Sequence, residues 1–168
     1  MTDSPVALRD AVIFDVDGTL VDVAPIRHYL HPNRAFRDFD AFHRVCVFCN
    51  PHTDVVSAAR ALHDGGVSVL VVTARRRRYE RFTRARLTKH DVPFAKLFMR
   101  DDDDRRLDAD VKWDILERIR RCYRVTHAYD DNPSVIALWA SEQIPVTVVP
   151  GWDDPIAMPA PRDAEEGV

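Results

Sequence analysis

The sequence predicts an α/β fold in which helices flank a parallel, Rossmann-like sheet. Two observations predict this class. Short apolar runs alternate with helical patterns along most of the chain, and this alternation is typical of parallel sheets with right-handed crossovers. The 168 residues, 46% of them hydrophobic, suit one domain with a sizeable core. We expect that domain over residues 1–150, with residues 21–50 as a small cap and residues 151–168 as a C-terminal tail.

The first element is a strand that ends at two carboxylates. Residues 11–14 are apolar and are followed by Asp15 and Asp17, and then by Gly18. A short apolar run with a turn signal at its end is typical of a buried strand. Taken alone, the segment also fits a strand that ends in an Asp-Gly turn with both carboxylates in water. Two carboxylates in one site repel each other, and Mg²⁺ is expected to compensate them because it prefers oxygen ligands.

Residues 21–50 follow no clear pattern and are expected to line the substrate entrance. Within and just after them, His43, Cys46, Cys49 and His52 occur at intervals of three, a spacing that suggests zinc. Four ligands so spaced on a helix span more than about 13 Å and cannot converge on one ion. The three cysteines of the chain also do not form a disulfide framework. We therefore interpret Cys46 and Cys49 as buried thiols.

Helices and strands alternate from residue 50 onwards. Asn50 and Pro51 predict the N-cap and the first residue of a helix, which Gly65 ends. The following elements are a strand at 67–72, a basic helix at 76–89, a weak strand at 96–99, a helix at 111–122, a strand at 125–129, a helix at 132–139 and a strand at 145–149. The four aspartates at 101–104 are expected to form a solvated loop, because they show no fixed ligand spacing.

Polar residues stand at the ends of three predicted strands. They are, strand by strand, Asp15 with Asp17, Thr73 with Arg75, and Asp130 with Asp131. The carboxyl ends of parallel strands meet at one edge of a sheet, and open α/β folds bind ligands there. The sequence therefore predicts one polar site at this edge.

The chemistry of these side chains suits phosphoryl transfer. A carboxylate can attack phosphorus as a nucleophile, and Mg²⁺ with cationic donors offsets the negative charge of the group. Asp15 is the candidate nucleophile, and Asp17, on the same side of the strand, is the candidate acid and base. Thr73 and Lys112 are candidates to hold the phosphoryl oxygens. The candidate ligands of Mg²⁺ are Asp15, Asp17, Asp130 and Asp131.

These motifs resemble, in order, those of the haloacid dehalogenase superfamily of phosphohydrolases. The resemblance rests on residues 15–20, Thr73, Lys112 and the Asp130-Asp131 pair, and it covers about residues 11–150. It implies a sheet of order 5-4-1-2-3 with a cap of variable size. It also implies a phosphatase that forms an aspartyl-phosphate on the first aspartate, while the second acts as acid and base.

A narrower resemblance is to the phosphatase domain of phage polynucleotide kinases. It rests on residues 71–75, on Met99 and Arg100, and on residues 129–139. By that analogy, Arg75 and Arg100 contact the substrate phosphate, which is a 3′-phosphate on DNA or RNA, and the reaction serves end repair. The Gly-x-x-x-x-Gly-Lys-Ser/Thr motif of a kinase half does not occur, and residues 21–50 align poorly.

The basic stretch at residues 75–86 indicates, independently of the resemblance, that the protein binds nucleic acid. Clustered arginines can contact backbone phosphates, and Arg77 and Arg81 are the candidate contacts beside the site. The alternative is a solvated helix face. Thr19, Asp40 and His43 are further candidate substrate contacts, the last two through a sugar. Phe42 could stack on a base, although ordinary packing is the alternative for the residues of the cap.

Charge and hydropathy limit which partners and which cellular location we expect. A formal net charge of −3 predicts no general attraction to nucleic acid or membranes, and no apolar stretch approaches the ~20 residues of a membrane span. Residues 1–5 lack the features of a signal peptide, so we expect a cytoplasmic protein. A phosphatase of nucleotides or other small phosphomonoesters is the first alternative. A non-catalytic binding protein is the second, although the complete motif set argues against it. The sequence does not indicate DNA over RNA, activity on cyclic phosphate ends, or oligomeric state.

Overall fold

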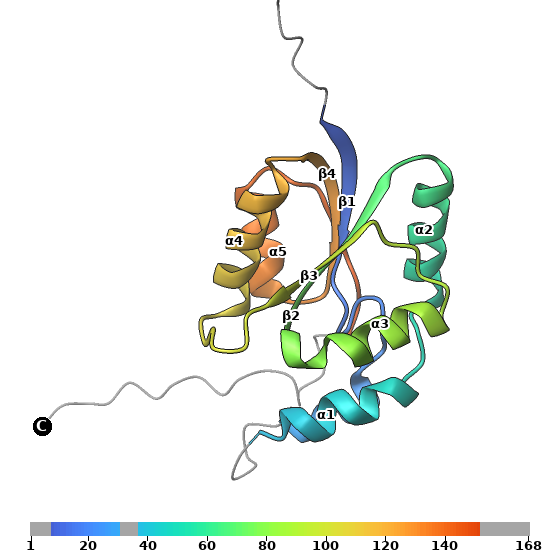
Figure 1. Ribbon diagram of the computed structural model, residues 1–168, viewed down its shortest axis with the longest axis vertical. Coiled ribbons are helices and arrows are strands. Elements are labelled where there is room, and N and C mark those ends of the chain that lie inside the picture. The colour runs from blue at the N-terminus through green and yellow to red at the C-terminus, as the bar shows by residue number, and fades with distance from the viewer. Residues whose placement is uncertain (1–7, 31–36, 152–168) are drawn as a thin grey trace, which may run out of the picture.

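A five-stranded parallel sheet runs through the centre of the protein, shown as a computed structural model in Figure 1. The structure describes residues 8–30 and 37–151. The strand order is β3-β2-β1-β4-β5, which is the predicted order read from the opposite edge. The predicted α/β fold class is therefore confirmed.

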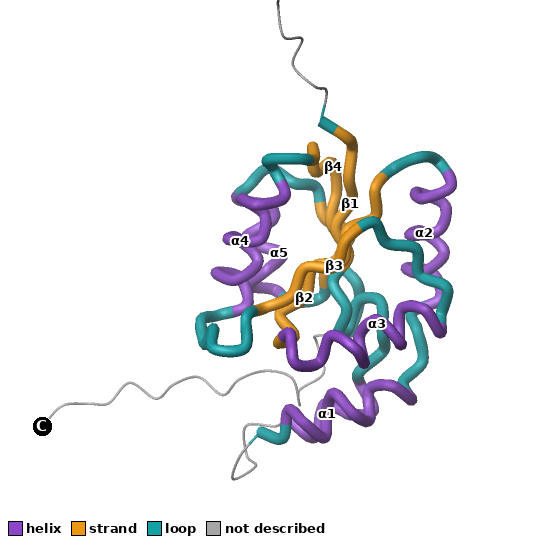
Figure 2. Tube along the Cα trace, in the orientation of Figure 1, coloured by secondary structure: helices purple, strands orange, loops and turns teal. Residues whose placement is uncertain are grey.

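Two helices cover each face of this sheet, α2 and α3 on one side and α4 and α5 on the other (Figures 1 and 2). The strands are β1 (Arg9–Phe14), β2 (Ser68–Arg76), β3 (Lys96–Arg100), β4 (Tyr123–Asp130) and β5 (Val146–Val148). The α-helices are α1 (Phe39–Val45), α2 (Thr53–Asp64), α3 (Glu80–Lys89), α4 (Asp108–Ile119) and α5 (Pro133–Ser141). Short 3-10 helices form η1 (Ala24–Leu30), η2 (Cys46–Phe48) and η3 (Arg77–Tyr79).

Alternating side chains of the central strand β1 feed two separate cores. Val12 and Phe14 pack on the α2 side, whereas Ala11 and Ile13 pack on the side of α4 and α5. All four are almost fully buried, as expected for a parallel strand that is covered on both faces. This burial fixes the direction in which β1 delivers the residues that follow it.

Several predicted boundaries were wrong by a few residues, such as that of the helix expected at 111–122, which is Asp108–Ile119. Tertiary pairing explains two of these differences. Helix α2 begins at Thr53 rather than Pro51, and His52 occupies its N-cap without a side-chain hydrogen bond. Pro51 instead forms a bridge with Val21, and the carbonyl of Asn50 accepts a hydrogen bond from Asp22. Strand β2 runs on to residue 76, because after a shift in register it pairs again with β3. The helical turn of η3 then precedes α3.

The chain between β1 and α2 crosses the carboxyl ends of the strands. There η1, α1 and η2 follow one another, and α1 lies beyond the ends of β1 and β2 (Figure 1). Phe42 and Cys46 from this segment join the core that α2 covers. The segment corresponds to the predicted cap at 21–50, of which residues 31–36 lie outside the described residues, as does all of the predicted tail except Gly151.

Among the described residues, no helix is long and apolar enough to cross a membrane.

Candidate active site

The carboxyl ends of β1, β2 and β4 bring the predicted polar residues together. The strands are held in register, since Phe14 of β1 pairs with Val71 of β2 and Tyr129 of β4. The rings of Phe14 and Tyr129 also stack, with centroids 4.4 Å apart. Asp15 directly follows β1, and Asp130 ends β4. Both therefore arrive at the same point of the sheet edge.

Lys112 of α4 joins these two carboxylates. Its Nζ donates to Asp15 Oδ1 at 2.7 Å and to Asp130 Oδ2 at 2.8 Å. The lysine is 2% exposed. Burial by itself lowers the pKa of Lys112, but the charges of Asp130 and Asp15 outweigh burial and raise it. The ammonium group is thus held charged between two carboxyl groups, and its role in binding phosphoryl oxygens stays a prediction.

Asp15, Asp130 and Asp131 form a group that can hold a metal ion. One carboxylate oxygen of each lies within 4.8 Å of the others. Burial raises the pKa of Asp15 well above its usual value, and burial with the charge of Asp130 raises that of Asp131 to about 7. Clustered anions with only oxygen donors fit a hard divalent cation such as Mg²⁺.

Gly18 permits the close approach of the loop after β1 to this group. Its φ is +85°, and a Cβ atom there would lie 1.9 Å from Oδ2 of Asp131. Any other residue would therefore collide with the carboxylate. Thr19, which is fully buried, donates to Asp131 Oδ1 at 3.3 Å. In this structure Thr19, a predicted substrate contact, therefore helps to hold the carboxylate of Asp131 in place.

Asp17 has a different partner from the other acidic residues. Arg75 donates to it twice, from Nε to Oδ2 at 2.7 Å and from Nη2 to Oδ1 at 2.5 Å. Burial raises the pKa of Asp17, but the charge and hydrogen bonds of Arg75 bring it below the usual value. The predicted metal ligand Asp17 therefore directs its carboxylate to an arginine here, and its part in metal binding stays a prediction.

Thr73 and Cys46 complete the surroundings of Arg75. The Oγ1 of Thr73 accepts the backbone N–H of Arg75 at 3.2 Å. The Sγ of Cys46 lies 2.8 Å from Arg75 Nη2 and 3.8 Å from Asp17 Oδ1. Burial and the charge of Asp17 raise the pKa of Cys46 to about 12, so the thiol is protonated. Cys46 and Cys49 are both buried and unbridged, as predicted.

Arg100 is engaged by the loop that follows β3. Its Nε donates to the carbonyl of Ala74 at 2.9 Å, and its Nη2 donates to Asp108 Oδ1 at 2.5 Å. Its Nη1 binds the carbonyls of Asp104 and Arg106. The guanidinium therefore organises residues 101–108 in this structure, and its predicted contact with substrate stays a prediction.

The predicted contacts from the cap pack against η3. Tyr79 donates from its hydroxyl to Asp40, and its ring centroid lies 4.2 Å from that of His43. Burial lowers the pKa of His43 to about 4, so the imidazole is neutral. Phe42 is only 3% exposed and its ring belongs to the core, so of its two interpretations ordinary packing is confirmed and stacking on a base is not. Phe39, which is 48% exposed, is the open aromatic ring of α1.

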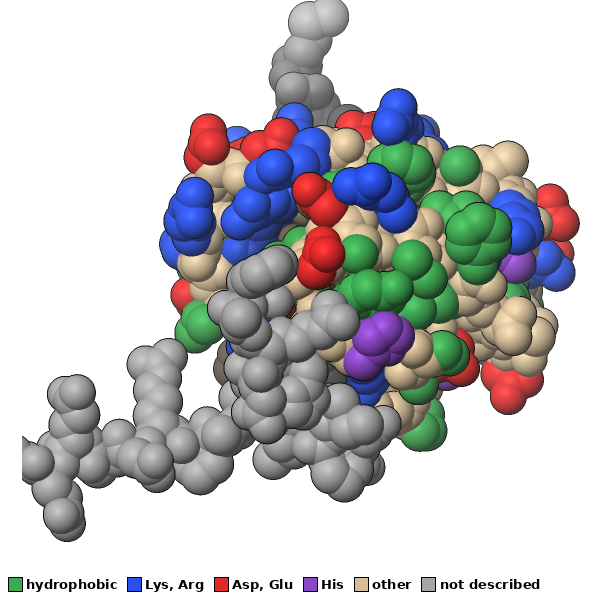
Figure 3. Space-filling view, turned by 90° about the horizontal axis from the view of Figure 1, so that it is seen from below, with side chains coloured by type: hydrophobic (Ala, Val, Ile, Leu, Met, Phe, Trp, Pro, Cys, Tyr) green, Lys and Arg blue, Asp and Glu red, His purple; other side chains and the backbone are tan. Residues whose placement is uncertain are grey.

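The two predicted nucleic-acid contacts are exposed, Arg77 on η3 and Arg81 on α3. Arg77 pairs through Nε with Asp101 Oδ1 at 2.9 Å, and Arg81 lies over the ring of Phe82. Figure 3 looks onto this end of the molecule, where basic side chains gather beside a few acidic ones. Arg86 differs, because it is 2% exposed and donates to the carbonyl of Val47. The basic stretch is therefore only partly available to a ligand.

Sequence reasoning missed two residues that touch the site. The indole Nε1 of Trp139 donates to Asp130 Oδ2 at 3.2 Å from a fully buried position on α5. Arg27 of η1 donates from Nη2 to Asp131 Oδ2 at 3.4 Å. Trp139 had a signal, since it lies nine residues after Asp130 in a helix that starts at Pro133. Arg27 lies in a segment without a readable pattern.

Comparison with known proteins places these features in context. The family model described as the polynucleotide kinase PNKP phosphatase domain matches residues 9–151. No curated protein sequence matches the chain significantly.

Solved structures resemble the chain in two groups. A chain of the Pnkp1/Rnl/Hen1 complex is 26% identical with a TM-score of 0.72, covering 88% of this chain and 47% of that one. A chain of the Pnkp1/Rnl/Hen1 RNA repair complex is 27% identical with a TM-score of 0.70, covering 88% and 44%. This chain thus spans less than half the length of those relatives. A class C acid phosphatase from Bacillus anthracis with tungstate bound, 12% identical with a TM-score of 0.66 and coverage of 87% and 68%, shares the fold.

Proposed function

Because this chain belongs to the polynucleotide kinase phosphatase-domain family of haloacid dehalogenase-type phosphatases, we propose that it removes 3′-phosphates from DNA or RNA ends with the help of Mg²⁺. One observation carries the proposal. The family match spans residues 9–151, and within it Asp15, Lys112 and Asp130 are joined by hydrogen bonds at the edge where substrates bind in such sheets. The similarity to a chain of a solved RNA repair complex supports the choice of a nucleic-acid substrate.

The acidic group of Asp15, Asp130 and Asp131 is the proposed Mg²⁺ site. Its three carboxyl groups lie close together, and burial, with a smaller contribution from the neighbouring aspartates, raises the pKa values of Asp15 and Asp131. When bound, the ion would offset the charge of these residues and of the phosphoryl group. The oxygen-only donor set favours Mg²⁺ over softer metals.

Asp15 acts as the nucleophile in this proposal. One of its oxygens attacks phosphorus, the bond to the 3′ oxygen breaks, and an aspartyl-phosphate forms on Asp15. Lys112, which holds Asp15 Oδ1 in the free protein, lowers the pKa of Asp15 against the effect of burial and so favours the ionised nucleophile; it then binds the phosphoryl oxygens. Thr73, buried in the neighbouring strand β2, supplies a further hydrogen bond to those oxygens.

Asp17 acts as acid and then as base, under the control of Arg75. The double hydrogen bond from Arg75 holds Asp17 ionised in the free protein. A substrate phosphate competes for the guanidinium, and the loss of that partner raises the pKa of Asp17 so that it can carry a proton. Asp17 gives this proton to the leaving 3′ oxygen. It later takes one from the water that hydrolyses the aspartyl-phosphate.

We propose that residues 21–50 serve as a small cap that admits a chain end. Only short helices cross the carboxyl edge in the described part of this segment, and exposed Arg77 and Arg81 lie beside it. Phosphate contacts of this kind bring a strand to the site and make its binding sensitive to salt. A mononucleotide or another small ester would gain little from them.

The experiment compares phosphate release, with Mg²⁺, from three substrates at equal concentration. These are a 3′-phosphorylated oligonucleotide, the same oligonucleotide with a 5′-phosphate, and a nucleoside 3′-monophosphate. We expect a strong preference for the 3′-phosphorylated strand, which should weaken as salt rises. If the mononucleotide is hydrolysed equally well or better, the phosphatase chemistry stands but the substrate belongs to small-molecule metabolism.

A further inference from the structure

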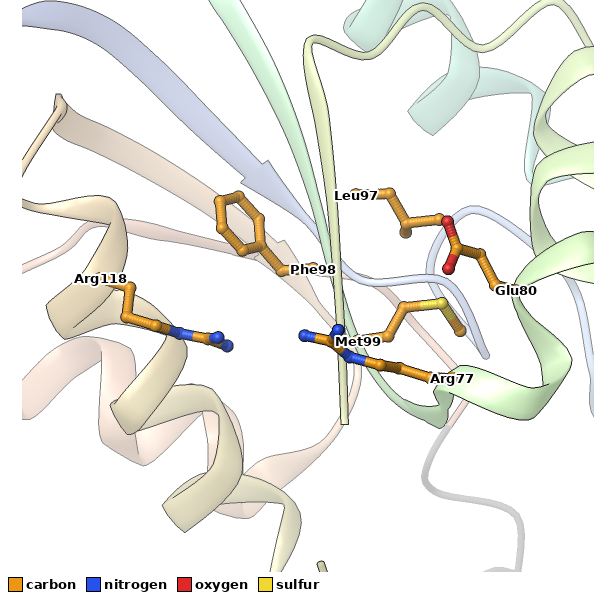
Figure 4. A pocket seen from close by; sticks show the side chains of 6 residues that line it. All are labelled: Arg77, Glu80, Leu97, Phe98, Met99 and Arg118. Atoms are coloured by element: carbon orange, nitrogen blue, oxygen red, sulfur yellow. The ribbon is translucent and has the colours of Figure 1, made fainter. Parts of the chain in front are cut away.

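A pocket of about 170 Å³ lies along β3, and none of the residues that line it belongs to the acidic group. Leu97, Phe98 and Met99 of the strand form its floor, and Arg77, Glu80 and Arg118 form its walls. Figure 4 shows the guanidinium groups of Arg77 and Arg118 pointing toward one another from opposite sides of the strand. Arg77 comes from η3 and Arg118 from α4. Two like charges therefore converge on one small space.

The positive charge of this pocket is only partly compensated. Glu80 is engaged by Arg84, whose Nε donates to its Oε1 at 2.7 Å. The closest contact between Arg77 and Asp101 joins Nε to Oδ1 at 2.9 Å, and among the described residues the terminal nitrogens of that arginine make no hydrogen bond. Arg118 is exposed and makes no ion pair or hydrogen bond within the described part of the chain. Both arginines can thus donate hydrogen bonds to an incoming anion.

The register of the sheet places this pocket beside the candidate active site. Met99 of β3 pairs directly with Thr73 of β2, the residue proposed to hold the phosphoryl oxygens. Adjacent strands lie about 4.8 Å apart, so the pocket is separated from Asp15 by little more than two strand spacings. In the described sheet β3 is an edge strand, so its outer side is open to a ligand that extends from the site.

We infer that Arg77 and Arg118 bind a backbone phosphodiester of the substrate strand, upstream of the terminal 3′-phosphate. This inference rests on the proposed function and adds a second point of recognition to it. The planar guanidinium group matches the oxygens of a phosphate, and two of them from opposite sides fix its position. The apolar floor of Leu97, Phe98 and Met99 offers a surface for the adjoining sugar or base.

The test measures how hydrolysis depends on strand length in the wild-type protein, Arg118→Ala and Arg9→Ala. Arg9 is a matched control, since it is exposed and unpaired among the described residues but lies at the opposite, amino end of β1. The substrates are a nucleoside 3′-monophosphate and 3′-phosphorylated single strands of increasing length. For the longer strands we expect Arg118→Ala to raise KM about five- to tenfold with kcat unchanged. The mononucleotide should be hydrolysed as before.

Salt dependence provides a second readout that a structural role would not change. Loss of one phosphate contact to a single strand should reduce the slope of log binding against log salt by about 0.7. Arg118→Glu should weaken the binding of long strands further than Arg118→Ala does. Arg9→Ala should leave both the slope and KM at the wild-type values.

The outcomes separate this inference from the proposed function. If the wild-type protein prefers long strands and Arg118→Ala keeps that preference, the pocket is not a subsite although the proposed function stands. An equal loss on every substrate would also overturn the inference, because it would place Arg118 in folding or catalysis. If the wild-type protein shows no preference for strands over the mononucleotide, both proposals fail together.

Discussion

The carboxyl edge of the sheet and the cap beside it are held together by different forces. At the edge, buried charges face each other, as in the contacts of Lys112 with Asp15 and Asp130. In the cap, largely neutral groups pack, and the rings of His43 and Tyr79 join α1 to η3. The first region therefore depends on every charge keeping its partner, whereas the second depends on His43 staying neutral. Substitutions that remove a charge should therefore destabilise or inactivate the edge. Low pH should destabilise the cap.

The largest effect is expected from Asp15→Asn. The amide keeps the shape of the side chain but cannot attack phosphorus, so activity should fall at least about 10³-fold. Circular dichroism should show an unchanged fold. Substantial remaining turnover would remove Asp15 from the role of nucleophile.

Lys112→Met tests the charge balance of the edge. It leaves Asp15 and Asp130 buried without their common cation, and breaking a buried pair in this way costs about 3–5 kcal/mol. The free energy of unfolding, measured by urea denaturation without metal, should fall by that order, and activity should be lost. Arg124→Met, which breaks an exposed pair with Asp10, is the control and should leave stability close to that of the wild type. Equal effects of the two changes would contradict the contrast between buried and exposed pairs.

His43 should make the cap sensitive to acid. Its pKa is lowered from 6.5 to about 4 in the folded protein. Between these values the unfolded chain binds a proton that the folded protein does not, so stability falls as pH drops through this window. The loss can reach about 3 kcal/mol.

Thermal unfolding at a series of pH values checks this prediction. His43→Phe should flatten the dependence between pH 6.5 and about 4. Phe42→Leu is the matched control, because it loosens the same packing while it keeps the imidazole, and it should retain the slope. If His43→Phe keeps the full slope, another group is responsible for the acid sensitivity.

The smallest effect is expected from Trp139→Phe. The change removes the N–H that binds Asp130 Oδ2, while Lys112 still donates to the same oxygen. A hydrogen bond to a charged group contributes about 1.5–3 kcal/mol, and part of this should appear as weaker binding of Mg²⁺, because Asp130 loses one of the groups that hold its carboxylate in place. Titration of activity with Mg²⁺ should show a higher half-saturating concentration. An unchanged titration would limit Trp139 to packing.

The sheet and its polar edge could be predicted because their signals are local. The central strands β1 and β2 contain short buried apolar runs. Asp15 directly follows β1 and Asp130 ends β4, so parallel pairing alone brings them together. Lys112 was located by family resemblance rather than by pattern. Its ion-pair partners are far away along the chain, Asp15 by 97 positions and Asp130 by 18. No local periodicity encodes such contacts.

The cap resisted prediction because long-range contacts decide its structure. Pro51 reads locally as a helix start, yet its bridge with Val21 moves that start to Thr53. Phe42 reads as a possible stacking ring, yet the core buries it. Arg86 likewise belongs to a basic run, but α3 turns it inward to the carbonyl of Val47. In each case tertiary packing overrode a plausible local interpretation.

The most direct test of the central claim identifies the residue that carries the phosphoryl group. The protein is mixed with a 3′-phosphorylated oligonucleotide and Mg²⁺, quenched in acid within one turnover, digested and analysed by mass spectrometry. We expect one added phosphoryl group on Asp15, and none when Asp15→Asn is treated in the same way. A phosphoryl group on Asp17, or turnover without any phosphorylated peptide, would contradict the assignment of Asp15, held by Lys112, as the nucleophile.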